Sequence, residues 1–197
     1  MPPLNTSQPD EISDTELMTG VQAGHEECLQ ALIERHQTRV IGIVVQMLGD
    51  ESEAEDLAQQ VFVRVWKSAK RYVPTARFTS WLLTITRNLT FNEIRRRQRC
   101  KLVAGGAEME QTMQPLEDVS VLSPAQKILD WEMQEMIQAA IERLPKPQRL
   151  ALVLRRYEEL PYEDIAQILG TSLPAVKSML FRAREELKHH VRRYLSC

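Results

Sequence analysis

Hydrophobic residues recur every three to four positions along most of the chain, the spacing that places side chains on one face of an α-helix. No stretch alternates strictly between apolar and polar residues, as a half-buried strand would. The pattern therefore predicts an all-α fold. In the first half of the chain, helices are expected at about residues 13–24, 25–48, 50–72 and 77–99.

Local signals mark the ends of these helices. Ser13 and Glu16 have the spacing of a capping box at the start of the first helix. Glycines are expected to end the first two helices, either Asp50 or Ser52 to cap the third, and Pro74 to end it. The apolar stripes of the third and fourth helices comprise Leu57, Val61, Phe62, Val65 and Trp66, and Phe78, Trp81, Leu82, Ile85 and Leu89.

The helical pattern stops between residues 101 and 123, where a glycine pair, a proline and scattered acids replace it. Such a composition is typical of a linker. Ser123 and Pro124 then have the residue types of an N-cap and a first helical position. Further helices follow at about 123–144, 146–160, 161–170 and 172–195. The sequence thus predicts two small helical domains, residues 1–100 and 124–197, joined by a flexible acidic linker at 101–123.

Charge is distributed in alternating blocks, although the whole chain carries a formal net charge of only -2. Residues 1–60 contain 2 Lys/Arg and 12 Asp/Glu, whereas residues 61–101 contain 11 and 1. Residues 102–142 contain 1 and 8, and residues 143–197 contain 11 and 6. Because charges are screened over about 8 Å at physiological salt, each block acts locally. Two separate basic surfaces can therefore meet nucleic acid.

Several classes of protein are disfavoured by what the sequence lacks. It has no signal peptide and no run of 18 apolar residues, so we expect a cytoplasmic protein with no direct membrane insertion. Cys28, Cys100 and Cys197 are odd in number and far apart, which argues against a disulfide framework. No glycine-rich phosphate loop, metal-ligand quartet or Ser/His/Asp set is present. We therefore expect no enzymatic activity, no metal and no cofactor.

The segment 162–187 has the pattern of a helix-turn-helix. Ile165, Leu169, Val176 and Leu180 can pack two crossed helices together, and Gly170 suits a turn with positive φ. Cations, a hydroxyl and a ring left outward on the second helix could contact phosphates and base edges. These residues are Leu173, Pro174, Lys177, Ser178, Phe181, Arg182 and Arg184. The alternative is an ordinary helical hairpin with a solvated basic face.

The run of arginines at 95–99 extends beyond the apolar stripe of its helix, with no obvious acid nearby to pair with it. A run of like charges is often only a solvated helix end. Here, however, the same helix carries Arg87 and Asn88, and the loop "RYVPTAR" precedes it. A loop followed by a basic helix suits a single DNA strand whose base leaves the stack. Trp81 is expected in the core because it belongs to the apolar stripe.

Both halves of the chain resemble the extracytoplasmic-function (ECF) group of bacterial RNA polymerase sigma factors, which retain regions two and four. In region two, the resemblance lies in "EAEDLAQQVFVRVW" and "FTSWLLTITRNLTFNEIRRRQR". In region four, it lies in "LPKPQRLALVLRRYEELPYEDIAQILGTSLPAVKSMLFRAREEL". The order and spacing of these segments are far more specific than a lone helix-turn-helix.

This resemblance implies a promoter-specificity subunit that binds core RNA polymerase and promoter DNA, and it implies an anti-sigma factor as a further partner. Polymerase contacts are implied for Asp56, Gln59, Gln60 and Arg64. The minus-ten element is implied to contact Tyr72, Thr75, Arg77, Arg87, Asn88, Arg95, Arg96 and Arg97. The recognition helix, with the outward residues from 173 to 184 given above, is implied to read the minus-thirty-five element.

Three positions depart from the usual pattern of that family: Gln60 replaces a frequent glutamate, Asn92 a frequent aspartate and Met179 a frequent arginine. Two other classes of protein remain alternatives. A dimeric helix-turn-helix regulator would leave the first domain's loop and arginines unexplained, and an enzyme would need a catalytic motif. Co-purification with core polymerase distinguishes the sigma factor from both.

Overall fold

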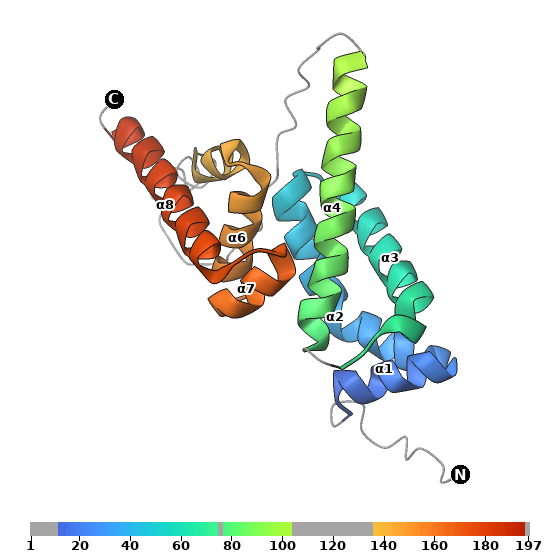
Figure 1. Ribbon diagram of the computed structural model, residues 1–197. Helices are drawn as coiled ribbons and strands as arrows, with labels where there is room; N and C mark the ends of the chain where they lie inside the picture. Colours follow the sequence, from blue (N-terminus) through green and yellow to red (C-terminus); the bar gives the residue numbers. More distant parts are fainter. Residues whose placement is uncertain (1–11, 75–76, 104–135, 196–197) are drawn as a thin grey trace, which may run out of the picture. The chain divides into compact units, whose positions relative to one another are not determined.

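The computed structural model describes residues 12–74, 77–103 and 136–195, and these ranges contain helices and no strand (Figure 1). The chain divides into two compact units, Met1–Arg97 and Gln98–Cys197. In the first unit, or beginning in it, are α1 Asp14–Ala23, α2 Glu26–Leu48, α3 Glu51–Ser68, the 3-10 turn η1 Ala69–Arg71 and α4 Phe78–Val103. In the second are α6 Lys146–Arg156, α7 Tyr162–Leu169 and α8 Leu173–Leu195, and residues 136–143 are also helical. The predicted all-α fold is confirmed.

The ends of the first three helices follow the local signals closely. Ser13 and Glu16 form the predicted capping box, in which Glu16 N donates to Ser13 Oγ and Ser13 N to Glu16 Oε2. Gly24 and Gly49 end α1 and α2 with left-handed backbone. Asp50, rather than Ser52, caps α3 by accepting from Glu53 N at 2.9 Å. The sequence placed the end of α3 too late, since the helix stops at Ser68 and η1 follows it.

The core of the first unit is built mainly from α1, α2 and α3, with the start of α4 packed against them. Leu57, Val61, Phe62 and Val65 of the predicted stripe are buried, but Trp66 is 37% exposed. The prediction that Trp66 belongs to the buried stripe of α3 was therefore wrong. On α4, Phe78 and Leu82 are buried, while Trp81, Ile85 and Leu89 are partly buried against the core.

A buried histidine connects three helices of this unit. His36 on α2 is only 4% exposed, and its Nε2 lies 2.8 Å from Asp14 Oδ2 on α1. Its ring packs against Phe78 at the start of α4, with 5.4 Å between the ring centroids. Burial lowers the pKa of His36, although Asp14 opposes that shift. The buried ring therefore packs α1 and α2 together against the start of α4.

Gly20 of α1 lies close to Cys28 of α2. A Cβ at Gly20 would lie 3.1 Å from Cys28 Cβ and closer still to its Sγ. Gly20→Ala is therefore expected to destabilise the protein by about 1–3 kcal/mol through overpacking. Gly42→Ala is the matched control, because a Cβ at this glycine of α2 meets nothing within 4 Å. It should stabilise by about 0.5–1 kcal/mol. Chemical unfolding measures both, and a Gly20→Ala variant as stable as the wild type would contradict the packing.

The second unit contains the predicted helix-turn-helix, formed by α7 and α8 on α6. Ile165, Val176 and Leu180 are buried between the helices, and Leu169 is half-buried. Gly170 has φ 63°, and its N–H donates to carbonyls in the last turn of α7. The glycine is needed because most other residues avoid this left-handed conformation. The predicted cap at residues 123 and 124 lies outside the described residues, as does the linker from residue 104 onward.

Two chemical features of the described ranges complete the fold. Cys28 is half-buried and Cys100 is exposed, and both are free thiols, while Cys197 lies outside these ranges. None of the helices in the described part of the chain is both long enough and apolar enough to cross a membrane.

Candidate protein and nucleic-acid interfaces

The exposed face of α3 carries all four residues predicted to contact polymerase. Asp56, Gln59, Gln60 and Arg64 are exposed, and they line one open groove of about 460 Å³. Val63, Lys67 and Leu89 complete the lining, the last of them from α4. Since Val63 is 51% exposed, the groove combines an apolar floor with a carboxylate, two amides and two cations. Such a mixture suits a protein partner.

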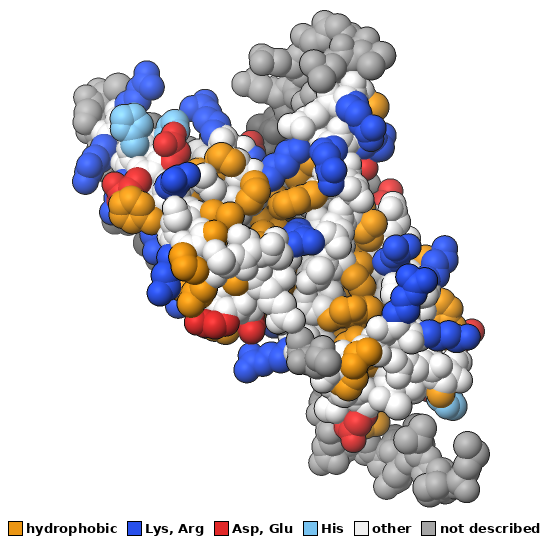
Figure 2. Space-filling view, in the orientation of Figure 1, with side chains coloured by type: hydrophobic (Ala, Val, Ile, Leu, Met, Phe, Trp, Pro, Cys, Tyr) orange, Lys and Arg blue, Asp and Glu red, His pale blue; other side chains and the backbone are white. Residues whose placement is uncertain are grey.

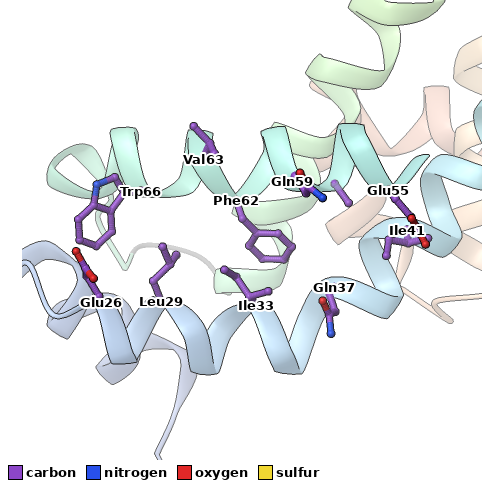
Figure 3. Close-up of a pocket in the computed structure, with 11 residues that line it drawn as sticks. Glu26, Leu29, Ile33, Gln37, Ile41, Glu55, Gln59, Phe62, Val63 and Trp66 are labelled. Atoms are coloured by element: carbon purple, nitrogen blue, oxygen red, sulfur yellow. The ribbon is translucent and has the colours of Figure 1, made fainter. Parts of the chain in front are cut away.

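A second groove, of about 640 Å³, runs between α2 and α3 and was missed by the sequence analysis (Figure 3). Leu29 and Ile33 of α2 point toward Phe62 and Trp66 of α3, and the acids at its edges are Glu26 and Glu55. Gln59 and Val63 line both grooves. Val63, an apolar residue outside the predicted stripe of its helix, is the sequence signal that could have indicated this second groove.

Tyr72 does not occupy the exposed position expected of a residue that contacts the minus-ten element. Its side chain is only 5% exposed, and its ring packs against those of Phe78 and Trp81 at centroid distances of 6.1 and 5.0 Å. Gln22 Nε2 donates to its backbone carbonyl at 2.8 Å. The tyrosine therefore anchors the loop to the core, and a direct contact between its ring and DNA conflicts with this burial. Val73 and Pro74 are exposed instead.

The remaining loop and helix residues differ in how accessible they are. Thr75 lies outside the described residues, and Arg77 is exposed immediately before α4. Asn88 is exposed and Arg87 is half-buried, which lowers the pKa of its guanidinium. Arg87 donates to Asn88 Oδ1 from Nε at 3.1 Å and from Nη2 at 2.6 Å. This pairing orients the amide and leaves its nitrogen to donate to another partner, such as a base.

The arginine run pairs with local groups, contrary to the sequence interpretation. Arg96 donates to both oxygens of Glu93 at 2.7 and 2.8 Å, and Arg95 donates to Asn92 Oδ1 at 2.9 Å. Their local acidic partner, not recognised from the sequence, is Glu93, which lies three and four positions before Arg96 and Arg97. Arg95 and Arg96 are nevertheless exposed, whereas Arg97 is half-buried. With Arg99 also exposed, the run therefore offers three surface cations and one largely internal cation.

The recognition helix α8 presents its predicted residues outward. Pro174, Lys177, Ser178, Phe181, Arg182 and Arg184 are exposed, and Leu173 is half-buried. Phe181 is 65% exposed, so its ring is accessible to a partner on the same face as the cations. Lys and Arg side chains gather along α8 and on the C-terminal part of α4 (Figure 2).

Two further residues join this face and were missed by the sequence analysis. The guanidinium of Arg155, at the end of α6, lies 5.4 Å from the ring centroid of Tyr162 at the start of α7. A hydrogen bond with Arg184 lowers the pKa of the Tyr162 phenol, and the charges of Arg155 and Lys177 lower it further. Two other helices, α6 and α8, thus place cations around one phenol, which no periodicity within a single helix reveals.

Comparisons with known proteins agree with this arrangement. Residues 32–100 match the family model for Sigma-70 region 2, and residues 134–187 match that for Sigma-70, region 4. The chain is 31% identical over 178 residues to the RNA polymerase sigma-H factor of Pseudomonas aeruginosa, covering 88% of this chain and 91% of that one. It is 28% identical over 186 residues to the ECF RNA polymerase sigma-E factor of Haemophilus influenzae, covering 92% and 97%.

Solved structures show the same fold at lower sequence identity. CnrH in complex with the cytosolic domain of CnrY has a TM-score of 0.66 at 20% identity, over 92% of this chain and 99% of that one. The sigma factor RpoE in complex with the anti-sigma factor NepR from Bartonella quintana has a TM-score of 0.68 at 22% identity, over 83% and 96%. With both region models matched in order, the chain belongs to the ECF sigma factors, which bind core RNA polymerase and direct promoter-specific transcription initiation.

Proposed function

We propose that this sigma factor binds core polymerase through the α3–α4 groove that Asp56, Gln59, Gln60 and Arg64 line. This proposal is supported by one observation. The four residues implied to contact polymerase are all exposed around one groove, which Val63 and Leu89 also line. A buried apolar centre with a polar rim is the usual anatomy of a protein interface. A groove lined by two helices also suits a partner that is itself helical.

The minus-ten element of the promoter is proposed to meet the exposed residues of the loop and of α4. Asn88 would hold a base with its amide nitrogen, because Arg87 engages the amide oxygen. The cations at the surface, Arg77, Arg95 and Arg96, would follow the backbone of the single strand. Thr75 remains assigned to this contact from the sequence, whereas Tyr72 supports the loop from below.

The minus-thirty-five element is proposed to lie against α8. Its outward residues would enter the major groove, where Lys177 and Arg182 can reach base edges or phosphates. Arg155, Tyr162 and Arg184 would hold a backbone phosphate beside the groove, because phosphates are fixed by cations and phenolic hydroxyls. Residues 1–100 would then bind polymerase and the minus-ten element, and residues 124–197 would bind the minus-thirty-five element. Residues 101–123 would link the two domains.

An anti-sigma factor is proposed as a third partner. Two sigma-fold neighbours are described in complexes, one with the cytosolic domain of CnrY and one with the anti-sigma factor NepR. The protein is further proposed to act in the cytoplasm, where polymerase works, and to contribute recognition without catalysis. In that case it affects transcription only through the free energy with which it binds polymerase and promoter DNA.

Arg182→Ala tests the assignment of α8. If Arg182 binds a guanine with two hydrogen bonds, the variant holoenzyme should lose about 1–3 kcal/mol of affinity for a duplex carrying the minus-thirty-five element, with relaxed preference at one base pair. If Arg182 contacts only phosphate, the loss should be uniform across sequences, and the slope of log affinity against log salt should fall by about one. Fluorescence anisotropy at several salt concentrations distinguishes the two.

Arg193→Ala is the matched control, since Arg193 is exposed on the same helix but three turns further along. It should leave both the affinity and the base preference of the holoenzyme unchanged. An Arg182→Ala holoenzyme with unaltered affinity, preference and salt slope would show that this basic face is only solvated.

A further inference from the structure

Arg97 lies in the arginine run of the minus-ten helix, yet its contacts lead into the first unit. We propose that Arg97 is a positioning residue, which fastens α4 to the start of α3 and so sets the geometry of the polymerase-binding groove. This inference rests on the proposed function of that groove. It removes Arg97 from the residues that contact DNA and gives it a role in binding polymerase.

The contacts of Arg97 join three helices. Its Nη1 donates to the carbonyl of Leu48, the last residue of α2, at 3.2 Å. Its guanidinium also forms ion pairs with Glu53 in the first turn of α3 and with Glu93 one turn back on α4, the latter at 3.4 Å. One side chain thus binds the end of α2, the beginning of α3 and its own helix.

Burial and charge distinguish Arg97 from its neighbours in the run. Its side chain is 19% exposed, against 61% for Arg96. Burial lowers the pKa of Arg97, and the charge of Asp50, the N-cap of α3, raises it. Two glutamates therefore compensate a charge that is largely removed from water. A phosphate would have to displace these carboxylates before it could bind this guanidinium.

The position of Glu53 explains why this contact bears on polymerase binding. Glu53 lies one turn before Asp56, which begins the lining of the α3–α4 groove. The opposite wall includes Leu89, two turns before Arg97 on α4. Because the groove takes its walls from both helices, a link between them fixes its width. Without Arg97, the start of α3 can shift relative to α4, and the groove loses its preformed shape.

Arg97→Gln and Arg96→Gln in the full chain test this role against a DNA contact. Arg97→Gln should weaken core polymerase binding about fivefold to tenfold, as expected for a pair in direct contact. It should leave unchanged the slope of log affinity against log salt when holoenzyme binds a single-stranded minus-ten oligonucleotide. Arg96→Gln should show the opposite result, with normal polymerase affinity and a slope smaller by about 0.7, the value for one phosphate contact on a single strand.

A double-mutant cycle separates positioning from a general loss of stability. Glu53→Gln should weaken polymerase binding to the same degree as Arg97→Gln, and the double variant should be no weaker than either, because the link is already broken. Arg97→Lys keeps the charge and should restore part of the affinity. Should Arg97→Gln fail to fold, Glu53→Gln and Arg97→Lys provide the same comparison.

Two results would overturn the inference: a reduced salt slope with unchanged polymerase affinity for Arg97→Gln, or additive losses in the cycle. Both leave the proposed function intact, provided that wild-type protein binds core polymerase. Failure of the wild type to bind would instead remove the proposed function itself.

Discussion

Asp56→Lys lowers the affinity of this sigma factor for core polymerase by about 2 kcal/mol or more, equivalent to about thirtyfold, as expected for a central interface residue. Asp56 is exposed at the α3–α4 groove, so its replacement leaves the core of the unit untouched. The lysine reverses a charge where a partner supplies a complementary group. Binding of labelled core polymerase to variant and wild-type protein measures the effect.

Glu51→Lys is the control for the alternative that acids in this region only complement the helix dipole, at about 0.3–1 kcal/mol each. Glu51 is exposed in the first turn of α3 and lines neither groove. It should therefore lower stability slightly and leave polymerase affinity unchanged. Equal losses of affinity for Glu51→Lys and Asp56→Lys would contradict the proposal that polymerase binds at this groove.

Asn88→Ala reduces formation of the open complex by about 1–3 kcal/mol on duplex promoters. This is the usual cost when a polar group enclosed in an interface, here the captured base, loses its hydrogen-bond partner. The effect should be much smaller on templates already mismatched at the minus-ten element. The reason is that capture of an unstacked base contributes most when the protein itself must hold the base out of the duplex. Permanganate reactivity of thymines in the melted region measures the open complex on both templates.

Asn92→Ala removes the same amide one turn further along α4, where Asn92 is exposed and paired with Arg95. It should affect both templates little. If Asn88→Ala lowers open-complex formation equally on duplex and mismatched templates, the amide contributes to folding or to DNA binding in general, and not to base capture.

Local sequence signals predicted the described helices and most of their exposed faces, although the end of α3 and the exposure of Trp66 differed. The capping box of Ser13, the left-handed glycines and the cap at Asp50 depend on residues at most a few positions apart. The outward residues of α8 follow from helical periodicity, because they lie opposite its buried stripe, whereas those of α3 were implied by the resemblance to sigma factors. For these features, the physics is contained in a short window of sequence.

Apart from the local pairing of Glu93 with Arg96 and Arg97, the contacts that sequence reasoning missed join distant segments. Arg97 is separated from Leu48 by 49 positions, and Tyr72 is held by Gln22 across 50. Tyr162 gains its cations from two other helices, and the groove between α2 and α3 requires both helices to leave Trp66 half uncovered. Periodicity assigns a side chain to a face of its own helix, but it does not say which partner meets that face.

Transcription in vitro tests whether this protein directs initiation at promoters that carry both elements. Core polymerase is mixed with the full chain and a library of promoter duplexes randomised at the minus-ten and minus-thirty-five elements, and the transcripts are sequenced. The account predicts transcripts that depend on the added protein and that select bases at both elements, with Arg182→Ala relaxing only the minus-thirty-five selection. Transcripts independent of the protein, or without base preference at either element, would contradict it.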